Sequence, residues 1–316
     1  MILNSIYTVL VIFILIGAGL FISHRKWVDR TTVQAFPKII INFSMPSLLL
    51  VSFTKSFTSE ELSRSGLLIL APLAATVVCF FLGRVFASVF KVSKSRRGVF
   101  TVLFALSNSV FIGFPVIQSL FGDAGMPYAT FFYMANTICF WTLGYYSIKK
   151  DAQIITGEIS KISIGEIIKK VLNVPLFFVV ISVLLVYWKI KLPEVVLKPA
   201  EYLGNLTTPL SMIFIGCILY DIGFKKLKME KDIILVIIGR FAVSGLVMFG
   251  TCYLLGIAGL AKDVYIMQMT LPAMTSTTIV SELVKADSEF AAKGMAWTTV
   301  LSLITIPLVI LIFSGS

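Results

Sequence analysis

Charged residues are scarce in this chain, and acidic residues are nearly absent from its apolar runs. The sequence holds one histidine, four cysteines and 16 Asp and Glu, against 27 Lys and Arg. Only Asp221, Asp263 and Glu282 approach an apolar run, and each lies near its end. Because proton and sodium sites in membranes usually contain a buried carboxylate, the pattern disfavours a buried acid pair that exchanges protons for cations.

Catalytic and nucleotide-binding motifs are missing too. No Ser/His/Asp set, H-E-x-x-H, Walker or dinucleotide pattern occurs, so we expect neither an enzyme nor an ATPase, and no cofactor. His24 follows the first apolar run and is expected at the surface. The four cysteines lie inside apolar runs without C-x-x-C spacing, so we expect packing residues rather than disulfides or metal ligands.

Long apolar runs dominate instead. Hydrophobic residues make up 58% of the chain and the mean hydropathy is +0.96, which is typical of an integral membrane protein. Ten apolar runs fall at about 3–23, 36–53, 66–90, 99–121, 127–148, 172–188, 202–220, 233–256, 263–284 and 290–313. The first run lacks a basic leader and a cleavage site, so we interpret it as a retained span.

The basic residues predict the orientation of these spans. Odd-numbered loops carry 19 of the 27 Lys and Arg and even-numbered loops carry 6, so odd loops are expected in the cytoplasm and both termini outside. The net charge of +11 therefore reports topology, and no nucleic-acid partner is expected. Arg84 and Arg240 lie inside spans 3 and 8. We expect both to snorkel to the cytoplasmic interface, with attraction of anions at the inner mouth as the alternative.

Five spans followed by five spans predict two repeats inserted in opposite senses. A shift of 163 residues places 42–46 on 205–209 and preserves the pattern N-x-(S/T)-x-P. We therefore predict an N-terminal repeat over 1–148, a cytoplasmic linker over 149–171 and a C-terminal repeat over 172–316. Within the linker, the mixed segment 154–172 fits a short interfacial helix or a solvated connection.

Two spans carry polar interruptions. Span 4 contains Ser-Asn-Ser-Val-Phe-Ile-Gly-Phe-Pro at 107–115, and Pro115 has no N–H to donate, so the helix is expected to kink or unwind there. Span 9 contains Pro272 inside the polar stretch 268–278. Broken backbone at membrane depth must be buried or line a wet cavity, and paired interruptions indicate a transporter's binding site.

Neutral amides and hydroxyls are the candidate ligands, and they suit a carboxylate or a polar organic molecule. Half-helix N-termini would add partial positive charge. The candidate substrate-binding residues are Ser107, Asn108, Pro115, Asn136, Asn42, Gln268, Pro272, Thr275 and Ser276. The alternatives are amides that join helices or patch a kink, and an aromatic run over 131–146 that packs the core rather than shaping a pocket.

These motifs together resemble the auxin efflux carrier family, which includes the plant PIN proteins and bacterial malate and malonate permease-like proteins. The stretch 108–115 is similar to the family's N-T-L-V-M-G-I-P, and 298–307 to the bacterial ending T-T-L-x-S-x-x-T-x-P. Leu271-Pro272, Pro209 and Ile215-Gly216 match further positions. The chain has Thr277 where the plant proteins carry a second proline, and it lacks their long central loop, so the plant substrate does not carry over.

The resemblance implies an all-α membrane protein with ten transmembrane helices in two inverted five-helix repeats. It also implies crossed broken helices 4 and 9 (a sodium/proton-antiporter-like or bile-acid-transporter-like fold), a scaffold of helices 1, 2, 6 and 7, and elevator-like alternating access. The family's substrate-contacting Asn maps onto Asn108, and its polar residue in span 5 onto Asn136. The resemblance also suggests a homodimer.

The sequence thus predicts a secondary transporter of small organic anions in the cytoplasmic membrane of a bacterium. Dicarboxylates and other short carboxylates are the preferred candidate substrates, and auxin or related aromatic acids are the second choice. The substrate is expected between the crossing and the face of spans 2 and 7. The sequence leaves three modes of transport open: coupling to H⁺, coupling to Na⁺, and facilitated uniport without a coupling ion. A channel, and a receptor or lipid-handling enzyme, are the other classes considered.

Overall fold

The structure is a computed structural model that describes residues 2–56, 66–157, 164–222 and 229–314 of the chain. Within these ranges the regular structure is helical, and the one β-type feature is an isolated bridge between two residues. The predicted all-α class is therefore confirmed.

Long apolar helices account for most of the fold. Six described helices are long and apolar enough to cross a membrane: Thr31–Lys55, Gly66–Val89, Ser109–Thr156, Glu194–Asp221, Lys231–Leu254 and Ser288–Ile310. Two shorter apolar helices, Leu10–His24 and Val174–Tyr187, lie where spans 1 and 6 are expected. The helix Ser109–Thr156 bends at Gly122, whose φ of 60° is open to glycine. The chain is thus a multi-pass membrane protein, while the count of ten spans stays a prediction.

The chain divides into two compact units, each of which draws on both halves of the sequence. Unit 1 comprises residues 1–67, 110–131 and 172–224, and unit 2 comprises 68–109, 132–171 and 225–316. This division does not test the predicted repeat boundaries, which concern sequence symmetry. Residues 158–163 of the expected linker lie outside the described residues.

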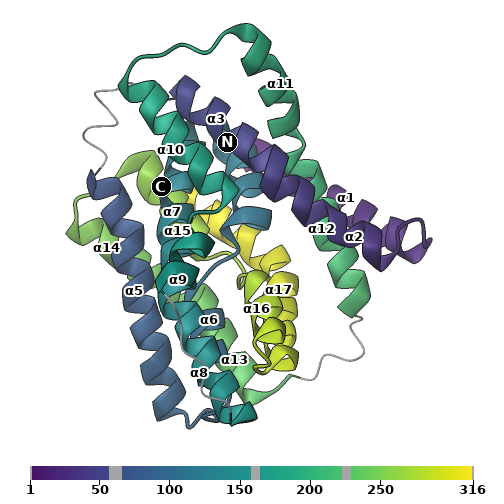
Figure 1. The fold of residues 1–316 in the computed structure, drawn as a ribbon, viewed down its shortest axis with the longest axis vertical. Helices are drawn as coiled ribbons and strands as arrows, with labels where there is room; N and C mark the ends of the chain where they lie inside the picture. The colour runs from purple at the N-terminus through teal and green to yellow at the C-terminus, as the bar shows by residue number, and fades with distance from the viewer. Residues whose placement is uncertain (1, 57–65, 158–163, 223–228, 315–316) are drawn as a thin grey trace. The chain divides into compact units, whose positions relative to one another are not determined.

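Unit 1 is built on a close helix pair. Its described helices include α1 Ile2–His24, α2 Arg30–Ile39, α3 Met45–Ser56, α10 Val174–Tyr187, α11 Glu194–Asn205 and α12 Thr207–Ile222. α1 packs along α12, and α3 packs against α10 and α11 (Figure 1). At the α1–α12 contact, a Cβ on Gly216 would lie 2.1 Å from the carbonyl oxygen of Ile16. Glycine is required here because only small residues let transmembrane backbones approach this closely.

Unit 2 contains the second predicted interrupted span, 263–284, and the first part of span 4 up to residue 109, while residues 110–121 of span 4 belong to unit 1. It includes the C-terminal part of α7 Phe114–Cys139, from residue 132 onward. Its other helices are α5 Gly66–Val89, α6 Arg97–Ala105, α8 Tyr145–Thr156, α9 Ile164–Val171, α13 Lys231–Ile238, α14 Ser244–Leu254, α15 Gly259–Met269, α16 Ser276–Leu283 and α17 Ser288–Ser314. α6 packs against α8 and α13, and α16 packs against α17 (Figure 1).

Short π-helical turns interrupt several of these helices. They are η1 Ile40–Ser44, η2 Ser109–Gly113, η3 Phe140–Gly144 and η5 Gly239–Val243. In η1, the N–H of Met45 donates to the carbonyl of Ile40, and the next residue, Pro46, has no N–H to continue an α-helical ladder. π-turns are rare and frequently accompany functional sites, which directs attention to the residues on them.

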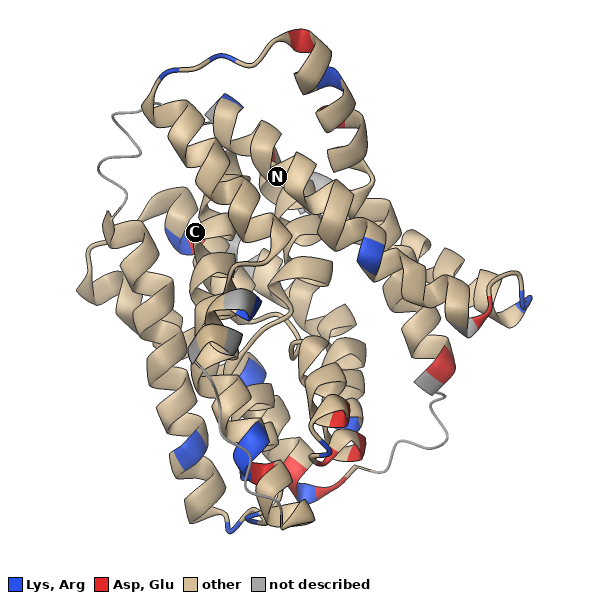
Figure 2. Ribbon diagram, viewed as in Figure 1, with Lys and Arg blue, Asp and Glu red and all other residues tan. Residues whose placement is uncertain are grey.

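The charged side chains of unit 2 gather at the ends of its helices (Figure 2). Arg96 contacts Asp287 at 3.0 Å, Glu230 at 3.2 Å and Asp232 at 3.8 Å, and Lys293 contacts Glu230 at 3.0 Å. Hydrogen bonds from Lys293 and then Arg96 hold the pKa of Glu230 below its ordinary value. This cluster, on residues that the sequence predicts to face the cytoplasm, pairs opposite charges with each other.

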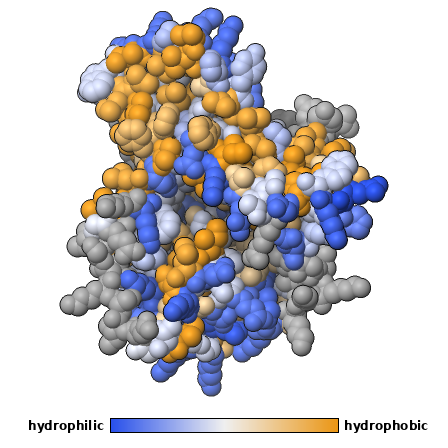
Figure 3. Space-filling model, turned by 45° about the vertical axis from the view of Figure 1, so that its right-hand side comes forward, coloured by the Kyte–Doolittle hydropathy of each residue, from blue (hydrophilic) through white to orange (hydrophobic). Residues whose placement is uncertain are grey.

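Apolar side chains cover much of the outer surface on the face shown in Figure 3. Tyr253, Leu254 and Leu283 are each more than three-quarters exposed. A soluble protein would not expose so many large apolar groups, whereas lipid acyl chains solvate them. The exposed apolar surface therefore agrees with the composition.

Candidate functional site

The two predicted interruptions are present, and the first lies earlier than predicted. α6 ends at Ala105, Leu106 is extended with φ −108° and ψ 126°, and the helix resumes only at η2. The helix is irregular beside Pro115, where the π-turn η2 directly precedes α7 within the continuous helix Ser109–Thr156, but the chain leaves the helical conformation earlier, after Ala105. In span 9, α15 ends at Met269 and α16 begins at Ser276, so Pro272 does lie within the break.

The two extended segments cross and pair with each other inside unit 2. The N–H of Asn108 donates to the carbonyl of Pro272 at 2.8 Å. The N–H of Met274 donates to the carbonyl of Leu106 at 3.1 Å, and an isolated antiparallel bridge lies between them. Each segment thus supplies the backbone partners that the other lost by leaving the helix, as buried polar backbone requires. We call these segments and the side chains bonded to them the crossing.

Two carboxamides hold the side-chain network of the crossing. The Nδ2 of Asn108 donates to Oγ1 of Thr275 at 2.9 Å. The Nδ2 of Asn136, on α7, donates to the carbonyl of Ser107 at 2.9 Å and to Oγ of Ser109 at 3.3 Å. All five residues are buried, the most exposed being Thr275 at 6%. The structure therefore brings Ser107, Asn108, Asn136, Pro272 and Thr275 together, as the sequence predicted.

Several buried polar atoms around the crossing have no hydrogen-bond partner among the residues that the structure describes. They include Oδ1 of Asn136, Oγ of Ser107 and both side-chain polar atoms of Gln268. Leaving such a group unpaired costs about 1–3 kcal/mol. Because a bound polar ligand would recover part of this cost, these atoms are available for recognition.

Arg240 corrects the sequence interpretation most clearly. Its side chain was expected to snorkel to the interface, but it is 0% exposed, and its Nη2 donates to the carbonyl of Met269, the last residue of α15. The guanidinium therefore lies at a helix C-terminus, where the helix dipole favours a positive charge. Within the described part of the chain, its Nε and Nη1 have no hydrogen-bond partner. Snorkelling failed as a prediction because the freed carbonyls of a broken helix offer an arginine an internal acceptor.

The crossing has one cationic side chain beside it. Arg240 is buried beside it, and no side chain caps the N-terminus of α16, which begins with the half-buried Ser276. None of the crossing residues carries a carboxylate. Among the described residues, no group of three or more His, Cys, Asp and Glu could hold a metal ion.

Two predicted site residues, Asn42 and Pro115, belong to unit 1 and not to the crossing. Asn42 belongs to unit 1, is exposed, and donates its Nδ2 to the carbonyl of Lys38 one turn earlier at 2.8 Å. This bond patches the π-turn η1, which is the structural alternative considered for that asparagine.

The sequence interpretation missed two hydroxyls that support the crossing. Oγ1 of Thr298, on α17, accepts the N–H of Ala273 at 3.1 Å, and Ser109 accepts a bond from Asn136. Thr298 opens the T-T-V-L-S stretch of the last apolar run, so its motif was visible although its partner was not. Thr298 thus holds the backbone of Ala273, and Ser109 holds the side chain of Asn136.

Comparison with known proteins agrees with this architecture. A family profile described as membrane transport protein matches residues 4–310. An uncharacterized transporter of Methanocaldococcus jannaschii is 27% identical over 309 residues, which cover 95% of this chain and 96% of that protein. An uncharacterized transporter of Methanothermobacter thermautotrophicus is 26% identical over 97% of each chain, and the uncharacterized transporter YfdV of Escherichia coli is 26% identical over 36% of each. The profile covers both interrupted segments and nearly the whole chain, and the chain therefore belongs to the membrane transport protein family, the auxin efflux carrier family that its motifs resemble.

Proposed function

We propose that this membrane transporter carries small organic anions, with dicarboxylates and other short carboxylates as its leading substrates, and binds them at the crossing. The observation that carries the proposal is the charge balance there: a buried arginine and an uncapped helix N-terminus, with no carboxylate among the crossing residues. Such a site stabilises a negative ligand and repels a cation. Amide and hydroxyl groups then supply directional hydrogen bonds to carboxylate oxygens.

Elevator-type alternating access is the mechanism that we propose. Its support is that unit 1 collects the segments of expected spans 1, 2, 6 and 7, while both interrupted segments pair within unit 2. A crossing that moves as part of one compact unit can keep its hydrogen bonds while its exposure changes. We also propose a cytoplasmic-membrane location with both termini outside, a homodimer, and coupling to H⁺ or Na⁺ or facilitated uniport.

Uptake into proteoliposomes tests the substrate class. The purified protein is reconstituted, and radiolabelled malate and malonate are supplied with and without sodium or proton gradients. We expect saturable uptake that is accelerated by unlabelled carboxylate on the opposite side, because a carrier exchanges substrate in each cycle. Stimulation by one gradient would identify the coupling ion.

Two alternatives predict different outcomes in the same assay. A carrier for aromatic acids would be inhibited by indole acetic acid and not by malate or malonate. A channel would conduct without saturation and without acceleration by substrate on the opposite side. If no anion were transported, the proposed substrate class would be wrong.

A further inference from the structure

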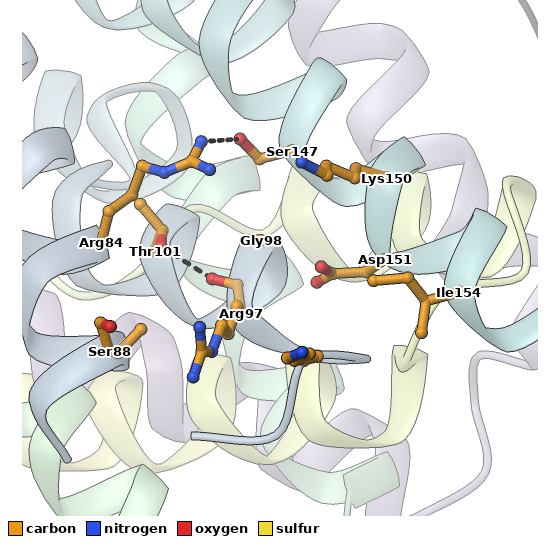
Figure 4. A pocket seen from close by; sticks show the side chains of 11 residues that line it. Arg84, Ser88, Arg97, Gly98, Thr101, Ser147, Lys150, Asp151 and Ile154 are labelled. Carbon is orange, nitrogen blue, oxygen red and sulfur yellow. Dashed lines mark hydrogen bonds between the residues drawn. The ribbon is translucent and has the colours of Figure 1, made fainter. Parts of the chain in front are cut away.

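A pocket of about 350 Å³ lies in unit 2, away from the crossing, where α5 ends, α6 begins and α8 ends (Figure 4). Four cationic side chains line it, Arg84, Lys94, Arg97 and Lys150, with Asp151 as the one acidic lining residue. No residue of the crossing lines it. The positive-inside pattern predicts that these helix ends face the cytoplasm.

The four cations outnumber the one carboxylate beside them. In the part of the chain that the structure describes, none of them forms an ion pair with another residue. The neighbouring Arg96, by contrast, contacts three carboxylates. Like charges in one concave site repel each other, and low-dielectric walls strengthen that repulsion. An unbalanced cluster beside a balanced one indicates that an anion from outside the chain completes it.

Asp151 offsets only part of the pocket's positive charge, because one carboxylate faces four cations. Its side chain is 3% exposed, and Oδ2 accepts the N–H of Val99 at 2.8 Å in the first turn of α6. A Cβ on Gly98 would lie 2.1 Å from the carbonyl oxygen of Ser147, so α6 and α8 are in direct backbone contact here. The floor of the pocket is thus fixed by packing and by a helix cap.

The two arginines are held in place with donors to spare. Nη1 of Arg84 lies 3.5 Å from Oγ of Ser147, and Nε of Arg97 donates to the carbonyl of Val92 at 2.9 Å. The terminal nitrogens of Arg97 have no partner among the described residues. Guanidinium groups with free donors bind the oxygens of phosphate in pairs, which a single ammonium cannot do.

We propose that this pocket binds a phosphate group that carries net negative charge, either the headgroup of an anionic phospholipid or a soluble phosphomonoester. Basic pockets between transmembrane helices on the cytoplasmic side are suited to phospholipid headgroups. Val85 and Val89, on the α5 turns that lead to the pocket, are 55% and 65% exposed, and they offer apolar surface to an acyl chain. A soluble phosphate would use the same donors without this surface.

Ligand-dependent melting of the full-length protein in detergent tests the proposal. The probes are dioleoyl phosphatidic acid, inorganic phosphate and glycerol 3-phosphate, with dioleoyl phosphatidylcholine and matched sodium chloride as controls. A ligand that binds the folded state raises the melting temperature in a concentration-dependent way. The double variant Lys94→Gln/Lys150→Gln removes two exposed charges that make no described contacts, and Arg84→Gln is a second variant. We expect half-saturation to require about tenfold more ligand in the double variant, as for the loss of one strong charge interaction.

The matched control is Lys38→Gln, an exposed lysine of unit 1 that the topology also places in the cytoplasm. It should respond as the wild type does. A shift with phosphatidic acid alone assigns the phosphate to a lipid, and a shift with the soluble phosphates alone assigns it to a metabolite. No shift with any of them, or an equal shift in the wild type and both pocket variants, would overturn the proposal.

Discussion

Replacing Arg240 by methionine separates folding from anion recognition. The guanidinium is fully buried and has one described acceptor, the carbonyl of Met269. Apolar replacement of buried ionic groups is often neutral or stabilises by about 1–4 kcal/mol, while an orphaned carbonyl costs about 1–3 kcal/mol. These contributions oppose each other, so we expect Arg240→Met to change the free energy of unfolding by less than about 2 kcal/mol.

Anion binding should respond much more strongly. A unit charge about 10 Å from an anion, at an effective dielectric constant of about 20, contributes ~1.7 kcal/mol, or slightly more than tenfold in affinity. Binding is measured by isothermal titration with malate or malonate, and folding by the melting temperature. Arg240→Lys is the control, because it keeps the charge beside Met269. Wild-type anion affinity in a folded Arg240→Met protein would refute the assignment of Arg240 as the source of the positive field.

Three further predictions concern packing, hydrogen bonding and pH. Asn136→Ala should slow carboxylate exchange at least tenfold and destabilise the protein by about 1–3 kcal/mol, because the carbonyl of Ser107 loses its donor; exchange kinetics and melting check this. Gly216→Val should lower the melting temperature, with a cost of about 1–3 kcal/mol or more, because its side chain would collide with backbone atoms of α1; an unchanged melting temperature would contradict that contact. Lys293 and Arg96 lower the pKa of Glu230, so their ion pairs stabilise above its ordinary value of 4.5 and are lost as pH falls through the lower folded value. Glu230→Gln should therefore lower stability at pH 7 by under about 1 kcal/mol, because the pair is exposed, and leave it unchanged at pH 3 when melting is followed across that range.

The sequence was sufficient to predict the helical class and the two interrupted helices, because these follow from local chemistry. Asn, Ser, Gly and Pro in the middle of an apolar run conflict with a continuous helix wherever they occur. The exact position of the first break was not predictable from Pro115, because a proline distorts a helix locally without determining where the chain leaves it. The preceding residues 106–108 leave the helix because they have partners in the distant segment 272–274, a pairing that no local pattern contains.

The roles of individual polar residues were likewise predictable where they depend on local sequence and not predictable where they depend on tertiary contacts. Asn108 and Asn136 were found because they lie on or near the interruption, whereas Asn42 has the same residue type and a proline four residues later, yet bonds only within its own helix. Arg240 was misjudged because its environment is tertiary: it is buried against the backbone of another segment, as is Asp151, for which the sequence made no prediction. From sequence alone, a charged residue in an apolar run is predicted to lie at the membrane interface, because the buried group that it bonds to is not visible in the sequence.

The central claim, that the crossing binds a carboxylate substrate, is tested most directly by counterflow in proteoliposomes with Asn108→Ala and its control Asn42→Ala. Both variants remove an asparagine that lies beside a helix irregularity, but only Asn108 belongs to the crossing. The account predicts that Asn108→Ala raises the half-saturating concentration of malate or malonate at least tenfold while the protein stays folded, and that Asn42→Ala transports as the wild type does. Unchanged affinity and rate in Asn108→Ala, with transport abolished in Pro115→Ala, would show that Asn108 is structural and contradict the assignment of the substrate site.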